Sequence, residues 1–95
     1  MTKIIFFLGQ ECNHCHVMFP LVDRLEKEHQ DMEIQRLEVW HHPENVETMK
    51  QYREAIKKEY GEEGLPTPTF INLDTGKALV GETSYEDLEA WAMGK

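Results

Sequence analysis

Two cysteines separated by two residues are the side chains with the clearest chemical potential in this chain. Cys12 and Cys15 are its only cysteines, and they follow an apolar run from Ile4 to Leu8 and precede an amphipathic stretch that starts at His16. A thiol at the start of a helix meets unpaired backbone N–H groups and the positive end of the helix dipole, which stabilise a thiolate. A thiolate beside a second thiol can exchange with a disulfide. The spacing therefore predicts that Cys12 is the exposed nucleophile and Cys15 the more buried resolving thiol.

Two ionisable neighbours are expected to tune the pKa of the Cys12 thiol in opposite directions. Positive charge on His14, between the two cysteines, favours the thiolate and makes the disulfide more oxidising. The carboxylate of Glu11, directly before Cys12, disfavours the thiolate. We expect the effect of His14 to be the larger one, which gives a comparatively oxidising pair.

Metal binding is the alternative function that the same residues allow. Four zinc ligands of acceptable type could be drawn from Cys12, Cys15, His14 or His16, and His41 or His42. Structural zinc sites usually combine two ligand pairs, whereas only one cysteine pair is present here. The sequence therefore favours disulfide exchange without a bound metal or other cofactor, and a zinc-binding, iron–sulfur or chaperone-like module is the second hypothesis.

Alternating strands and helices are expected to position the dithiol. Apolar periodicity predicts a strand over residues 3–8, a helix over 13–29 and a second strand over about 33–40. The buried face of the first helix is predicted to hold Met18, Leu21, Val22 and Leu25. Pro43 favours the start of a second helix and Gly61 its end. One side of that second helix is formed by Val46, Met49, Arg53, Ile56 and Tyr60.

The last third of the chain predicts a hairpin and a final helix. Strands over 69–73 and about 77–81 are joined by a tight turn, and Thr83 with Glu86 fits a capping box for the helix. The buried side of that helix is predicted to hold Leu88, Trp91 and Ala92. The resulting order, β-α-β-α-β-β-α, predicts an α/β fold with a four-stranded mixed sheet and helices on both faces.

Composition excludes several classes of function. The chain of 95 residues is long enough for a single domain, residues 1–95, with one modest core. Its net charge of −8 argues against binding to nucleic acid or to an anionic membrane surface. Because no apolar stretch is long enough for a membrane span or a secretion signal, we expect a cytoplasmic protein. We also expect it to be a monomer. Two cysteines in one motif fit a catalytic or metal role in that reducing compartment.

The order of elements, with Cys-x-x-Cys after the first strand, resembles the thioredoxin superfamily in its short, glutaredoxin-sized form. Pro20 lies five residues after Cys15, where thioredoxins carry a proline in the active-site helix. Thr67-Pro68-Thr69-Phe70 is similar to the family's cis-proline segment, with Gly76 at the following hairpin turn and Pro66 as a rival for the cis bond. The resemblance extends from Lys3 to Trp91 and implies a thiol:disulfide oxidoreductase.

The same resemblance implies the partners of the site. Thr67 and Pro68 would bind the substrate, because the main chain of this segment lies beside the cysteines in the family and pairs with an extended chain. The substrate would be a disulfide-containing protein or a small thiol compound. Electrons would come from a partner reductase or a small thiol.

Departures from the thioredoxin pattern concern the neighbours of the cysteines. Glu11 replaces a tryptophan, Asn13-His14 replaces Gly-Pro, and Phe6 stands where thioredoxins carry a buried aspartate. The proton acceptor of the buried cysteine is therefore missing. A histidine before the second cysteine is similar to the oxidising members, so we expect a redox potential above that of thioredoxin.

Overall fold

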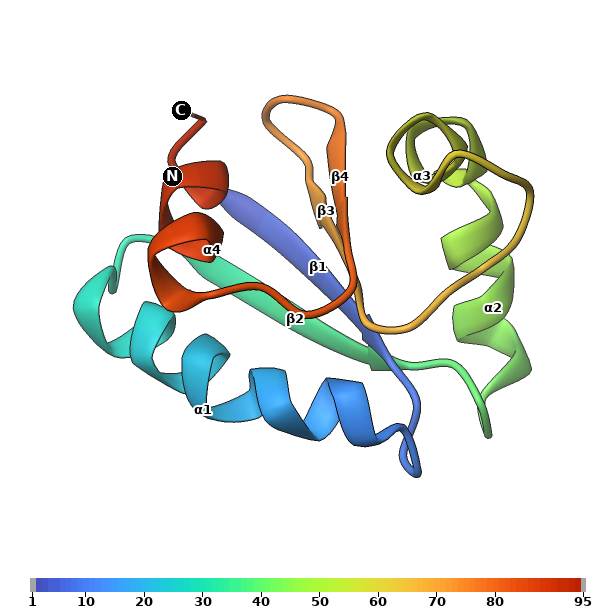
Figure 1. The fold of residues 1–95 in the computed structure, drawn as a ribbon, viewed down its shortest axis with the longest axis horizontal. Helices are drawn as coiled ribbons and strands as arrows, with labels where there is room; N and C mark the ends of the chain where they lie inside the picture. The colour runs from blue at the N-terminus through green and yellow to red at the C-terminus, as the bar shows by residue number, and fades with distance from the viewer. Residues whose placement is uncertain (1, 95) are drawn as a thin grey trace.

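One four-stranded sheet lies between two pairs of helices in the computed structural model, which describes residues 2–94 (Figure 1). The elements in chain order are β1 (Lys3–Leu8), α1 (Asn13–Glu28), β2 (Glu33–Glu38), α2 (Pro43–Lys50), α3 (Arg53–Tyr60), β3 (Thr69–Asn72), β4 (Lys77–Val80) and α4 (Tyr85–Ala92). The strands follow the spatial order β2-β1-β3-β4, with β1 and β2 parallel and the other two pairs antiparallel. The predicted mixed sheet with helices on both faces is confirmed.

The alternating side chains of β1 divide the core into two layers. Ile4, Phe6 and Leu8 belong to the layer under α1 and α4, whereas Ile5 and Phe7 belong to the layer under α2 and α3. Successive side chains of a strand point to opposite faces, so an uninterrupted apolar run is typical of a strand covered on both sides. This central strand ends at Leu8 and delivers the chain to the cysteine loop.

The predicted helix over 43–60 is wrong, because the structure has two helices with a break at Gln51 and Tyr52. The N–H groups of these two residues donate to carbonyls three residues earlier, Thr48 at 3.1 Å and Met49 at 3.0 Å. The break turns the Tyr52 ring towards Phe7, with the ring centroids 6.3 Å apart. Neither proline nor glycine marks this point in the sequence. The break coincides instead with the packing of Tyr52 against the sheet.

The residues expected along one side of that helix separate accordingly. Met49 and Ile56 are fully buried and Val46 packs against them, but Arg53 and Tyr60 are exposed. In α1, Met18, Val22 and Leu25 are buried as predicted, and Leu21 packs against the same layer. Pro20 lies inside this continuous helix.

The start of α4 also differs from the prediction. Ser84, and not Thr83, is the N-cap residue: its side chain accepts a hydrogen bond of 3.2 Å from the backbone N–H of Asp87. Thr83 donates its hydroxyl to the carbonyl of Ser84 at 2.9 Å, so the capping box of Thr83 and Glu86 does not form. None of the helices in residues 2–94 combines the length and the apolar character that crossing a membrane requires.

Candidate active site

Cys12 is held in place by the end of β1 and the start of α1. Its backbone N–H donates to the carbonyl of Gly9 at 3.1 Å, and Cys12 is itself the N-cap residue of α1. Position 9 requires glycine because the indole ring of Trp40 packs directly against its backbone, and a Cβ there would lie 2.3 Å from that ring. The tight turn from Gly9 to Cys12 therefore brings the sulfur to the helix N-terminus.

The Cys12 sulfur is the centre of a small hydrogen-bond network. It accepts from the backbone N–H of Cys15 at 3.3 Å and from the Thr67 hydroxyl at 3.4 Å, and it lies 3.7 Å from the Thr67 carbonyl oxygen. These contacts cover the side chain, so Cys12 is only 5% exposed and Cys15 is fully buried. The prediction of an exposed Cys12 is wrong, since the Thr67 segment, distant in sequence, covers it.

Hydrogen bonding and burial shift the pKa values of the two thiols in opposite directions. Burial opposes ionisation of Cys12, but hydrogen bonds from Cys15, from Thr67 and from the backbone at Cys15 and His14 outweigh it and lower the pKa of Cys12. Burial, followed by the interaction with Cys12, raises the pKa of Cys15 to about 11. At neutral pH the favoured anion is therefore on Cys12, the sulfur at the helix N-terminus.

The segment from Pro66 to Thr69 forms the second wall of the site. The Thr67–Pro68 peptide bond is cis, and it is the one such bond in residues 2–94. The Pro68 carbonyl accepts from the N–H of Gly81 at 2.9 Å, and the Thr69 hydroxyl donates to the Pro66 carbonyl at 2.7 Å. Thr67 is thereby held against the Cys12 sulfur.

The His14 ring lies against a residue that the sequence did not single out. Its Nδ1 contacts a carboxylate oxygen of Glu82, in the loop between β4 and α4. Both side chains are on the surface, with 71% of His14 and 40% of Glu82 exposed. No local motif links these positions, which are 68 residues apart, so only the fold identifies Glu82 as a neighbour of His14.

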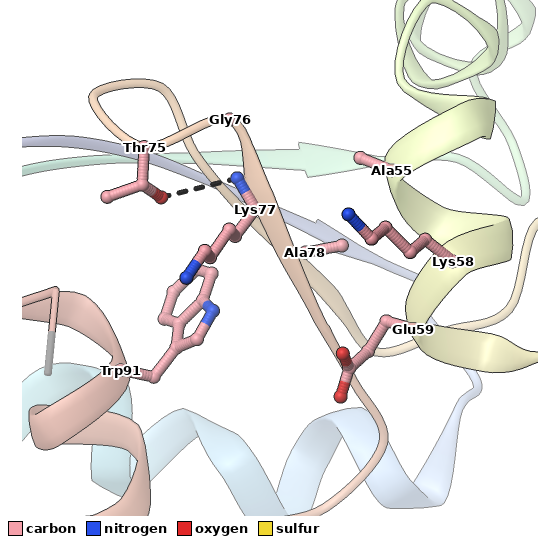
Figure 2. Close-up of a pocket in the computed structure, with 8 residues that line it drawn as sticks. All are labelled: Ala55, Lys58, Glu59, Thr75, Gly76, Lys77, Ala78 and Trp91. Atoms are coloured by element: carbon pink, nitrogen blue, oxygen red, sulfur yellow. Dashed lines mark hydrogen bonds between the residues drawn. The ribbon is translucent and has the colours of Figure 1, made fainter.

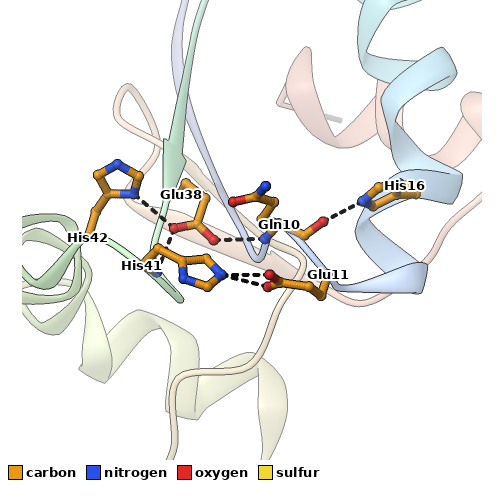
Figure 3. A network of polar contacts seen from close by, with 6 residues as sticks. All are labelled: Gln10, Glu11, His16, Glu38, His41 and His42. Atoms are coloured by element: carbon orange, nitrogen blue, oxygen red, sulfur yellow. Dashed lines mark hydrogen bonds and ion pairs between the residues drawn. The ribbon is translucent and has the colours of Figure 1, made fainter.

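Glu11, the residue before Cys12, and His41 join a polar network at the ends of β1 and β2 (Figure 3). The Nε2 of His41 donates to both carboxylate oxygens of Glu11 at 2.7 Å, and this pairing raises the pKa of His41. Glu38 accepts from the backbone N–H groups of Gln10 and His41, both at 2.7 Å, and from the Nδ1 of His42 at 2.9 Å. The ends of β1 and β2 are thereby joined beside the cysteine loop.

Replacing Glu38 by Gln is expected to lower the free energy of unfolding by roughly 1–3 kcal/mol at pH 7, because it removes charge-assisted hydrogen bonds to two loops. Burial opposes ionisation of Glu38, but its hydrogen bonds from His42, His41 and Gln10 lower its pKa to about 2. The depressed pKa means that this stabilisation is complete above the unfolded-state pKa of about 4.5 and is lost as the pH falls towards 2.

Urea unfolding of the native protein and of Glu38→Gln at pH 7 and at pH 3 measures this effect. The difference between the two proteins should shrink at pH 3, since Glu38 has then lost part of the advantage of its charged form. The matched variant Glu33→Gln, at an exposed position at the start of β2, should unfold like the native protein. A difference that stays constant from pH 7 to pH 3 would contradict the assigned role of the carboxylate.

The histidines and cysteines of the metal hypothesis are not gathered into one cluster. His14 contacts Glu82, and His16 donates to the carbonyl of Gln10 at 2.7 Å. Within residues 2–94, the groups of three potential ligands are Glu11 with Glu38 and His41, and Glu28 with His29 and Glu89. Neither group includes a cysteine.

A separate pocket lies between α3, β4 and α4 (Figure 2). It has a volume of about 470 Å³, and its lining includes Lys58, Lys77 and Trp91. The indole Nε1 of Trp91 is buried without a hydrogen-bond partner in the part of the chain that the structure describes. Because none of the lining residues comes from the cysteine loop or from the Thr67 segment, this pocket is not part of the dithiol site.

Comparison with known proteins identifies the fold. No protein-family model and no curated protein sequence matches the chain. A similar solved structure comes from work on the thiol resolving mechanism in yeast mitochondrial 1-Cys peroxiredoxin via the glutathione/thioredoxin systems. The match has a TM-score of 0.67 and 20% sequence identity, and it covers 99% of this chain and 78% of the other. The chain therefore has a thioredoxin-like fold.

Proposed function

We propose that this protein is a thiol:disulfide oxidoreductase whose redox pair is Cys12 and Cys15. The observation that carries the proposal is the opposite shift of the two thiol pKa values, downwards at Cys12 and to about 11 at Cys15. An easily ionised thiol beside a buried one suits attack by the first and resolution by the second. The likeness to a structure concerned with thiol resolution by glutathione and thioredoxin systems supports the same chemistry.

The proposed reaction consists of two exchange steps. The Cys12 thiolate attacks one sulfur of the substrate disulfide, so a Cys12–substrate bond forms while the substrate's own S–S bond breaks and its other sulfur leaves as a thiolate. Cys15 then loses its proton to solvent and attacks the Cys12 sulfur, which closes the Cys12–Cys15 disulfide and releases the second substrate thiolate. The substrate gains the two electrons that the protein loses.

The remaining residues of the site have supporting roles in this proposal. An extended substrate segment would pair with the main chain of Thr67 and Pro68, beside the Cys12 sulfur. His14 and Glu11 would tune the pKa of the Cys12 thiol, in opposite directions. The protein would act in the cytoplasm as a monomer without a bound cofactor, and a partner reductase or a small thiol would reduce its disulfide again.

Dithiothreitol-dependent reduction of 2-hydroxyethyl disulfide tests the proposal. Cys12→Ser is expected to lower the catalysed rate at least about 100-fold, because a serine hydroxyl is not ionised at neutral pH. Without dithiothreitol, the matched variant Cys15→Ser should react once with 2-hydroxyethyl disulfide and accumulate a mixed disulfide, visible by mass spectrometry. Circular dichroism checks that both variants are folded. Retained turnover in Cys12→Ser would refute the assignment.

A further inference from the structure

The charged side chains around Cys12 are unevenly distributed. We define the active-site edge as the four segments that meet there, residues 9–20, 38–46, 65–69 and 81–84. They are held together by the contacts between Gln10 and Glu38, between Thr67 and Cys12, and between Pro68 and Gly81. The chain has ten lysines and arginines, but none lies in this edge. The edge contains four glutamates and four histidines: Glu11, Glu38, Glu44 and Glu82, and His14, His16, His41 and His42.

Three of these glutamates have a histidine as the cationic partner of their side chain. The pairs are Glu11 with His41, Glu38 with His42, and Glu82 with His14. A glutamate is fully charged at neutral pH, whereas a histidine is positively charged only while it is protonated, a form that Glu11 favours in His41. The carboxylates of the edge are therefore balanced by no permanent cation of the edge itself, and Glu44 has no ion-pair partner among residues 2–94, which leaves the edge with excess negative charge.

Exposed apolar surface accompanies this negative charge. Trp40 is 51% exposed although its indole ring lies against Gly9, and Val17, two residues after Cys15, is 53% exposed. Large apolar side chains at the surface that flank polar groups are typical of contact regions. The surroundings of Cys12 thus offer apolar contact together with carboxylates.

We propose that the active-site edge selects disulfides flanked by positive charge, with Glu11 and Glu82 as specificity-determining residues. The inference rests on the proposed exchange reaction of Cys12 and names its class of substrate. Glu11 directly precedes the nucleophile in the sequence, and its side chain is 57% exposed. Glu82 contacts His14, which lies between the two cysteines in the sequence. A basic segment approaching Cys12 is attracted by both carboxylates, while an anionic segment is repelled.

Three small symmetric disulfides that differ in charge test this selectivity. They are cystamine, with two positive charges, 2-hydroxyethyl disulfide, which is neutral, and 3,3′-dithiodipropionate, with two negative charges. The kcat/KM of each is measured with dithiothreitol as reductant and divided by the rate of its uncatalysed reaction. We expect the normalised values to fall from cation to neutral to anion, with a ratio of cation to anion of about tenfold at low salt.

Salt and matched variants locate the origin of the selectivity. The ratio should approach one when the salt concentration rises from about 0.01 M to about 1 M, because the Debye length falls from roughly 30 Å to 3 Å. Glu11→Gln and Glu82→Gln should each lower the low-salt ratio about threefold. The control Glu33→Gln, which removes one carboxylate outside the active-site edge, should leave the ratio unchanged.

The outcomes separate this inference from the function on which it rests. Equal normalised rates for the three disulfides would overturn the charge selectivity while leaving the oxidoreductase intact. An equal loss of selectivity in Glu33→Gln would also overturn it, since the net charge of the whole chain would then be responsible. Failure to reduce even 2-hydroxyethyl disulfide would refute the oxidoreductase itself.

Discussion

Iodoacetamide is expected to alkylate Cys12 at least about 100-fold faster than Cys15 in the folded, reduced protein at pH 7. Only the thiolate reacts, so the rates follow the ionised fractions of the two thiols. With a pKa of about 11, roughly one Cys15 in ten thousand is ionised at pH 7. Cys12 has a pKa below that of an ordinary thiol, so its ionised fraction is larger by more than two orders of magnitude. Quenched samples and tandem mass spectrometry distinguish the two positions.

Unfolding in urea provides the control for the alkylation experiment. In the unfolded chain the helix N-terminus, the Thr67 hydroxyl and the burial of Cys15 are all lost, so the two cysteines should react at similar rates. Cys12 is 5% exposed and Cys15 is fully buried, so burial and protonation both slow the reaction of Cys15 in the folded protein. Equal labelling of both cysteines in the folded protein would contradict the assigned protonation states.

Local patterns in the sequence were sufficient for the sheet and for the position of the dithiol. The apolar run of β1 and the spacing of four and three residues between Met18, Val22 and Leu25 each reflect the period of one element, so they can be recognised without knowledge of the fold. The helix that starts at Asn13 comes after the end of that run, with only a short turn between them. Cys12 is then placed at a helix N-terminus by neighbours in the chain alone.

Features that depend on contacts between distant segments were not predictable in this way. The break at Gln51 and Tyr52 arises where Tyr52 packs against Phe7, and no helix-breaking residue marks it. Cys12 is buried by Thr67, which is 55 residues away in the chain. Glu82 has no motif that would connect it to His14. Each of these contacts joins segments that lie far apart in the sequence and meet only in the folded protein.

Release of a thiol from a mixed disulfide on Cys12 is expected to accelerate about tenfold per pH unit between pH 7 and pH 9. The release requires the Cys15 thiolate, whose fraction rises tenfold per unit while the pH stays below its pKa of about 11. A mixed disulfide removes the influence of the Cys12 anion, but burial, the main cause of the raised pKa, remains. Protein charged with nitrothiobenzoate reports the rate through the absorbance of the released thiol.

The core behind Cys15 explains why no internal base should shorten this step. Phe6 belongs to the same buried cluster as Cys15 and stacks on Phe70, with ring centroids 4.5 Å apart, so β1 presents an aromatic ring and not a carboxylate to this layer of the core. Cys15→Ser should release no nitrothiobenzoate at any of these pH values, which ties the observed rate to the second thiol. A release rate that is constant from pH 7 to pH 9 would mean that another group deprotonates Cys15. With Phe6 in place, the exchange depends on the rare ionised form of the buried thiol.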